Sequence, residues 1–79
     1  MELKHLDIVK WKFPMNKIEE MDLMVVEDVT GNMVEVRHVR DGDNVSRERA
    51  DTLMLIGRAT PNDTYQELIK KYSKLLRKF

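Results

Sequence analysis

The 79-residue chain has no cysteine and no long apolar run, and both absences restrict what it can be. Without cysteine, neither a disulfide framework nor a thiolate metal site can support a small core. The longest apolar runs are four residues, such as Leu53–Ile56, whereas a membrane span needs about 20. The first residues carry acids and no apolar signal core, so no secretory peptide is expected. A cytoplasmic location, in a bacterial host if a phage encodes the chain, is therefore the expectation.

The chain also lacks net charge, since 14 Lys and Arg side chains balance 14 Asp and Glu side chains. The balance is uneven along the chain. Residues 1–45 hold 6 basic and 10 acidic side chains, a net −4, and residues 46–79 hold 8 basic and 4 acidic ones, a net +4. Because phosphate neutralisation supplies most nonspecific affinity for nucleic acid, overall neutrality disfavours that class without excluding a local basic surface.

The first half of the chain has the patterns of strands. Residues 7–13 alternate in the period of a half-buried strand with Val9, Trp11 and Phe13 on its core face, and Pro14 ends it. Residues 15–20 fit either a helical turn or an irregular loop. Residues 23–27 and 33–39 predict a β-hairpin, because Gly31-Asn32 between them can adopt the positive φ of a tight turn.

The second half has helical spacing. Ser46 can cap a short helix over residues 46–56, with Gly57 as its C-terminal cap. Thr60-Pro61 is typical of a helix start and predicts a long amphipathic helix over residues 62–79. The expected fold is a single α+β domain, residues 1–79, with a three- to four-stranded antiparallel sheet, one short helix and one long C-terminal amphipathic helix able to project beyond the sheet.

Residues suited to catalysis are scarce, so we expect no enzyme, no cofactor and no metal. The chain has no Gly-rich phosphate loop and no nucleophile elbow. His38 precedes Asp41 and Asp43, and such a cluster could hold a divalent ion. A strand-end imidazole beside a solvated Asp-Gly turn is the favoured interpretation.

Lys10, Trp11 and Lys12 form the one place where an aromatic residue lies between basic residues. This arrangement could stack a nucleic-acid base while the ammonium groups contact phosphates. The favoured alternative places Trp11 in the core and both lysines in water.

The C-terminal helix carries an apolar stripe and a basic face. The stripe consists of Tyr65, Leu68, Ile69, Tyr72, Leu75, Leu76 and Phe79. Its first half is expected to pack on the sheet, and Tyr72, Leu75, Leu76 and Phe79 are the candidate partner-binding residues. The opposite face carries the candidate anion-binding residues Lys70, Lys71, Lys74, Arg77 and Lys78. Fold support, docking to a protein or a second copy, and anion binding all remain open for this helix.

Two resemblances add to this interpretation. The segment Val45–Ala59, with its Leu-Ile-Gly-Arg-Ala ending, resembles a segment of short bacteriophage proteins in which a hairpin feeds a helix. The order hairpin, short helix, Gly57-Arg58-Ala59 and Thr60-Pro61 is similar to the N-terminal RNA-binding domain of large-subunit ribosomal protein nine. The first resemblance implies a phage or prophage accessory protein that acts by binding a protein partner or itself. The second implies a small RNA- or DNA-binding module as the alternative.

Overall fold

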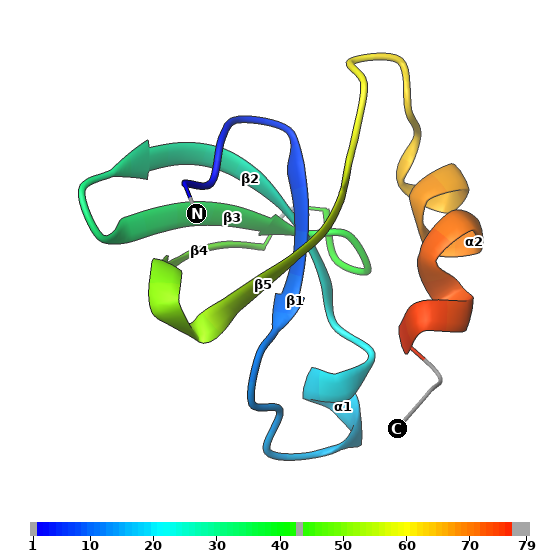
Figure 1. Cartoon of the computed structure of the whole chain (residues 1–79). Coiled ribbons are helices and arrows are strands. Elements are labelled where there is room, and N and C mark those ends of the chain that lie inside the picture. The colour runs from blue at the N-terminus through cyan, green and yellow to red at the C-terminus, as the bar shows by residue number, and fades with distance from the viewer. Residues whose placement is uncertain (1, 43, 77–79) are drawn as a thin grey trace.

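A computed structural model describes residues 2–42 and 44–76, with the side chains of residues 74–76 left undescribed. The chain forms an α+β fold around one five-stranded antiparallel sheet in the order β4-β3-β2-β1-β5 (Figure 1). The strands are β1 (Asp7–Trp11), β2 (Leu23–Thr30), β3 (Met33–His38), β4 (Val45–Arg49) and β5 (Leu53–Arg58). The helices are α1 (Lys17–Glu20), the 3₁₀ turn η1 (Ala50–Thr52) and α2 (Tyr65–Leu76). Within the described ranges, no helix is long and apolar enough to cross a membrane.

The predicted β-hairpin is confirmed. β2 pairs with β3 up to Thr30 opposite Met33, so Gly31 and Asn32 make a two-residue turn. Gly31 has a φ of 59°, the left-handed conformation that glycine adopts without a steric cost. β2 is longer than expected because pairing with β3 continues beyond a bulge between Val26 and Asp28.

The predicted short helix over residues 46–56 is wrong, and the sheet therefore has five strands in place of three or four. β4 pairs with β3 residue by residue, for example Ser46 opposite Val36, and β5 pairs with β1. Ser46 and Gly57 thus lie in strands and cap no helix. Long-range pairing overrides the helical spacing here. Both resemblances included a short helix over these residues, and the structure has two strands there instead.

The sheet is strongly bent, because β4 and β5 lie at its opposite edges and are joined only by η1 (Figure 1). Five strands laid flat would separate the two edges by about 19 Å. The step from Arg49 to Leu53 can span at most about 14 Å. Bulges between β2 and β3 and between β1 and β5 help the sheet to bend.

Buried apolar side chains form two clusters, one on each face of the sheet. The first cluster lies between the sheet and α2 and comprises Ile8, Leu23, Val25, Val39, Ala59, Leu68 and Tyr72. The second lies on the other face and comprises Val9, Met24, Val26, Val34, Val36 and Leu53, with Leu3, Trp11 and Ala50 packed against it. β1 contributes to both clusters, so the expected half-buried strand is instead buried on both faces.

The long C-terminal helix begins later than predicted. Residues 60–63 form a turn in which the Thr60 N–H donates to the Asp63 side chain at 2.8 Å. α2 starts at Tyr65, where the Thr64 hydroxyl accepts from the Glu67 N–H at 3.2 Å and donates to the Glu67 carboxylate at 2.9 Å. The helix cap is therefore formed by Thr64 and Glu67. The sequence pattern predicts it earlier, at Thr60 and Pro61. Residues 77–79 lie outside the described part of the chain.

Candidate functional site

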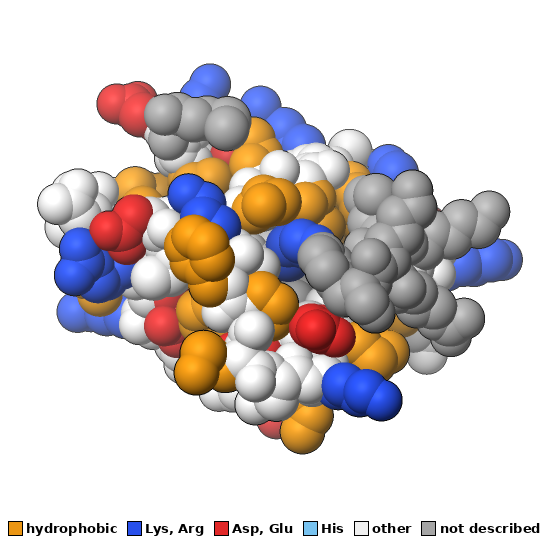
Figure 2. Space-filling view, turned by 60° about the horizontal axis from the view of Figure 1, so that its bottom comes forward, with side chains coloured by type: hydrophobic (Ala, Val, Ile, Leu, Met, Phe, Trp, Pro, Cys, Tyr) orange, Lys and Arg blue, Asp and Glu red, His pale blue; other side chains and the backbone are white. Residues whose placement is uncertain are grey.

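Among the residues whose side chains the structure describes, the most exposed large apolar ones lie in the connection between β1 and β2. Residues 12–21, called the apolar loop below, carry Phe13, Met15 and Ile18, which are 76%, 84% and 77% exposed. Figure 2 turns the α1 end of the molecule toward the viewer, and hydrophobic side chains reach the surface there between charged ones. Phe13 was expected on the core face of β1, but the strand ends at Trp11 and Phe13 points into solvent.

Hydrogen bonds fix the shape of the apolar loop. The Asn16 side chain accepts from the Glu19 N–H at 2.9 Å and begins α1. The Glu19 carboxylate in turn accepts from the Met15 N–H at 2.9 Å. At the base, the Lys12 N–H donates to the Thr52 carbonyl at 2.9 Å. These hydrogen bonds therefore give the apolar loop a defined conformation, in which its apolar side chains lie at the surface.

A chain of polar side chains crosses the sheet at the base of this loop. The Trp11 Nε1–H donates to Asp22 Oδ2 at 2.9 Å. His38 Nδ1 lies 3.1 Å from Asp22 Oδ1 and 3.0 Å from Asp22 Oδ2. His38 Nε2 lies 2.9 Å from Ser46 Oγ. Four segments that are distant in sequence thus meet in one network beside the second apolar cluster.

The sequence pattern does not reveal this network, because its members are far apart along the chain. Sequence spacing pairs His38 with Asp41 and Asp43 of the following turn, whereas the imidazole turns to Asp22 and Ser46. Asp43 lies outside the described residues. Among the described residues, no group of three or more His, Asp or Glu side chains could hold a metal ion.

The structure does not bring Lys10, Trp11 and Lys12 together as a stacking site. Trp11 packs against the second apolar cluster, as the favoured interpretation expected. Lys12 is exposed, but Lys10 is only 7% exposed and does not point into water. Burial lowers the pKa of Lys10, while the negative charge of Glu20 acts in the opposite direction. Lys10 and Lys12 therefore do not present a shared basic surface around an open aromatic ring.

The candidate residues of α2 divide between core and surface. Tyr72 is 6% exposed and lies in the first apolar cluster with Leu68, whereas Tyr65 and Ile69 remain partly exposed. Lys70 and Lys71 are exposed, and the Lys71 ammonium lies 5.6 Å from the centroid of the Tyr72 ring. The side chains of Lys74, Leu75 and Leu76, and all of Arg77, Lys78 and Phe79, lie outside the described part of the chain.

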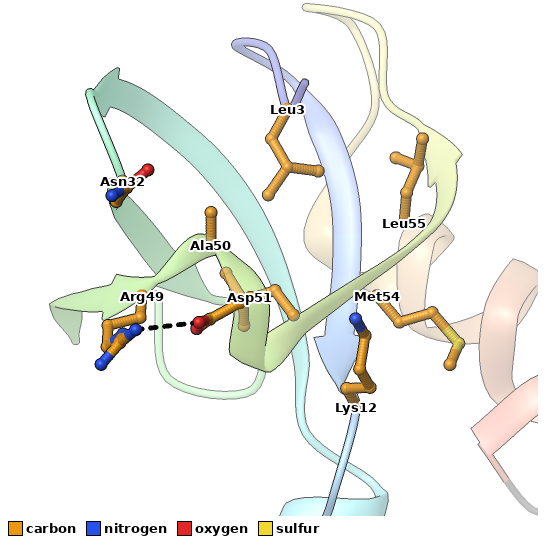
Figure 3. Close-up of a pocket in the computed structure, with 9 residues that line it drawn as sticks. Leu3, Lys12, Asn32, Arg49, Ala50, Asp51, Met54 and Leu55 are labelled. Carbon is orange, nitrogen blue, oxygen red and sulfur yellow. Dashed lines mark hydrogen bonds and ion pairs between the residues drawn. The ribbon is translucent and has the colours of Figure 1, made fainter. Parts of the chain in front are cut away.

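A hollow of about 430 Å³ lies between the N-terminal segment, η1 and β5 (Figure 3). Leu3, Ala50 and Leu55 supply apolar walls, and the Arg49 guanidinium at its rim is paired with the Asp51 carboxylate at 2.9 Å. Lys12 also lines the hollow, so its charged groups are two cations and the Asp51 carboxylate. Neither His38 nor Ser46 lines it.

No protein-family model, curated protein or solved structure matches this chain.

Proposed function

We propose that this protein is a non-enzymatic interaction module that binds another protein through the apolar loop. The observation that carries the proposal is the exposure of Phe13, Met15 and Ile18, each more than three-quarters exposed within six residues. Isolated exposed apolar residues are ordinary, but a cluster of large ones is typical of an interaction site. A protein-binding module is also the class expected from the sequence, but the proposed contact surface is the apolar loop and not α2.

The order of the loop supports this role. A loop that is already fixed by the Asn16, Glu19 and Lys12 hydrogen bonds loses little conformational entropy when it binds. Met15 offers an adaptable thioether side chain, and Phe13 and Ile18 offer stiffer apolar anchors. The loop is therefore suited to insertion into an apolar recess of a partner.

Charge and area favour a protein recess over other occupants. Within the loop, Lys12 and Lys17 are balanced by Glu19 and Glu20, so an anionic membrane or a nucleic acid gains little electrostatic attraction. Even if each of the three side chains buried the 150–250 Å² typical of an aromatic residue, they would supply about 450–750 Å², less than the roughly 800 Å² per partner of a stable interface. A tip-to-tip contact between two copies would be too small, whereas a larger partner can enclose the loop and reach its surroundings.

The test places a photo-crosslinking phenylalanine analogue at position 13 of the full chain. We expect one discrete protein to be cross-linked in an extract of the source cells and to bind the purified chain afterwards. Ile18→Glu should weaken that binding at least tenfold, because loss of a hot-spot side chain costs about 2 kcal/mol or more. Met33→Glu is the matched control, since Met33 is also exposed but belongs to the β2–β3 hairpin.

Other results would overturn the proposal. Sedimentation showing a dimer that Ile18→Glu dissociates would make a second copy the occupant. Cross-links to phospholipid would indicate a membrane surface. Binding to RNA or DNA that weakens steeply with salt and depends on Lys70 and Lys71 would favour the nucleic-acid module instead.

A further inference from the structure

We propose that Ser46 is an acylation site, a serine nucleophile that accepts acyl groups from activated esters with His38 as its general base. The geometry carries the proposal: Ser46 Oγ lies 2.9 Å from His38 Nε2. On the other side of the ring, His38 Nδ1 lies 3.0 Å from Asp22 Oδ2. A hydroxyl, an imidazole and a carboxylate joined in this order form the arrangement that activates a serine, irrespective of fold.

The chemistry of the partners fixes the tautomer of the neutral His38 ring. An indole nitrogen can only donate, so the Trp11 hydrogen bond requires an accepting oxygen on Asp22. The ionised carboxylate accepts from His38 as well, which places the ring proton on Nδ1. In this neutral tautomer Nε2 carries a lone pair that can accept from the Ser46 hydroxyl, whose oxygen lies 2.9 Å away. This is the tautomer that a general base needs.

The surroundings hold the three groups in place. The side chains of His38 and Asp22 are 12% and 17% exposed, so little water competes for their hydrogen bonds. Asp22 is a positioning residue that acts through His38, and Trp11 holds Asp22 in turn. Trp11, His38 and Ser46 lie on β1, β3 and β4, and Asp22 directly precedes β2, so the sheet holds all four side chains in a fixed arrangement.

The site is also open to a reagent. Ser46 is half-buried on β4, which pairs only with β3 among the described strands. The His38 N–H bonds the Asn44 carbonyl, and the register of β3 and β4 continues this pairing to Val36 and Ser46. Backbone groups alternate along a strand, so the Arg47 N–H points to the outer edge of the sheet. Ser46 itself is only half-buried, so a small ester can reach its side chain from the solvent-exposed part.

The reaction step is an acyl transfer. The Ser46 oxygen attacks the ester carbonyl carbon, and its proton passes to His38 Nε2. The tetrahedral intermediate collapses with cleavage of the bond to the leaving alcohol, whose oxygen takes the proton from His38. Ser46 is left as an O-acyl ester, and the step needs no oxidant, reductant or cofactor.

The decisive experiment uses the wild-type chain and p-nitrophenyl acetate, followed by peptide mass spectrometry of each acetylated residue. The chain has two serines, and Ser73 is the internal control because its hydroxyl donates to the Lys70 carbonyl on α2 and, among the described residues, bonds no histidine. A positioned general base contributes about 10²- to 10⁴-fold, so we expect Ser46 to be acetylated at least tenfold faster than Ser73. Equal rates at the two serines would mean that the network is purely structural and would overturn the proposal.

Two variants test the roles of the other groups. In His38→Ala, acetylation of Ser46 should fall to the Ser73 rate and recover when imidazole is added to the solution. In Asp22→Asn, the rate should fall and the nitrogen NMR spectrum should show the ring proton moved from Nδ1 to Nε2, a change that lost packing would not cause. Unchanged acetylation in folded His38→Ala would contradict the proposal. If His38→Ala does not fold, the comparison of Ser46 with Ser73 still decides the question.

Discussion

α2 and the apolar loop both carry large apolar side chains outside the sheet, but only α2 uses them for folding. α2 turns Leu68 and Tyr72 into the first apolar cluster, where they are 2% and 6% exposed. The apolar loop leaves Phe13 and Ile18 more than three-quarters exposed. Helical spacing directs one face of α2 to the sheet, while the loop is held by hydrogen bonds at its base and within α1. Apolar character alone therefore does not tell which residues stabilise the fold.

The largest expected effect is that of Leu68→Ala in α2. Leu68 fills the space between the helix and the sheet, and emptying such a core position costs about 2–5 kcal/mol of unfolding free energy. Chemical denaturation checks this value. Ile69→Ala is the control from the next position of the same helix, and it should cost less because Ile69 is 36% exposed. Equal losses for the two variants would contradict the orientation of α2.

The sequence predicted those parts of the fold that local chemistry decides. The Gly31-Asn32 turn was predictable because few residues tolerate a positive φ. The amphipathic helix was predictable because its spacing persists over several turns, although its start was wrong by several residues since the Thr64 cap competes with the Thr60-Pro61 signal.

The rest depended on pairing between distant segments. Residues 46–56 have helical spacing by coincidence, and their strands exist because β3 and β1 offer pairing partners. The network was hidden for the same reason, since His38 is 16 residues from Asp22 and 8 from Ser46. Only the register of the sheet brings these three side chains together. The exposure of Phe13 likewise depends on where β1 ends, which Pro14 alone does not fix.

An intermediate effect is expected for Gly57→Ala in β5, which disturbs the contact between α2 and the sheet without emptying the core. A Cβ atom at position 57 would overlap the Tyr72 hydroxyl oxygen, so the buried ring would have to move. Overpacking of this kind costs about 1–3 kcal/mol. Thermal unfolding checks the loss, with Met54→Ala in the exposed part of the same strand as the control. A variant as stable as its parent would mean that Tyr72 is not fixed against Gly57.

The smallest expected effect on stability is that of Phe13→Ser and Ile18→Ser in the apolar loop, made singly and together. Both side chains lie mostly in water, so their removal should change the unfolding free energy by no more than about 0.5 kcal/mol per site.

Trp11→Phe is the informative control at the base of the loop. It removes the hydrogen bond to Asp22 and should cost about 0.5–1.5 kcal/mol, because the loop is attached to the sheet there. Denaturation curves should show that Trp11→Phe is less stable than the wild type. The loop variants should be about as stable as the wild type. A loss of about 2 kcal/mol or more in Phe13→Ser would place that ring in a packed environment. The apolar loop would then be a third element of the core, and its role as a contact surface would have to be abandoned.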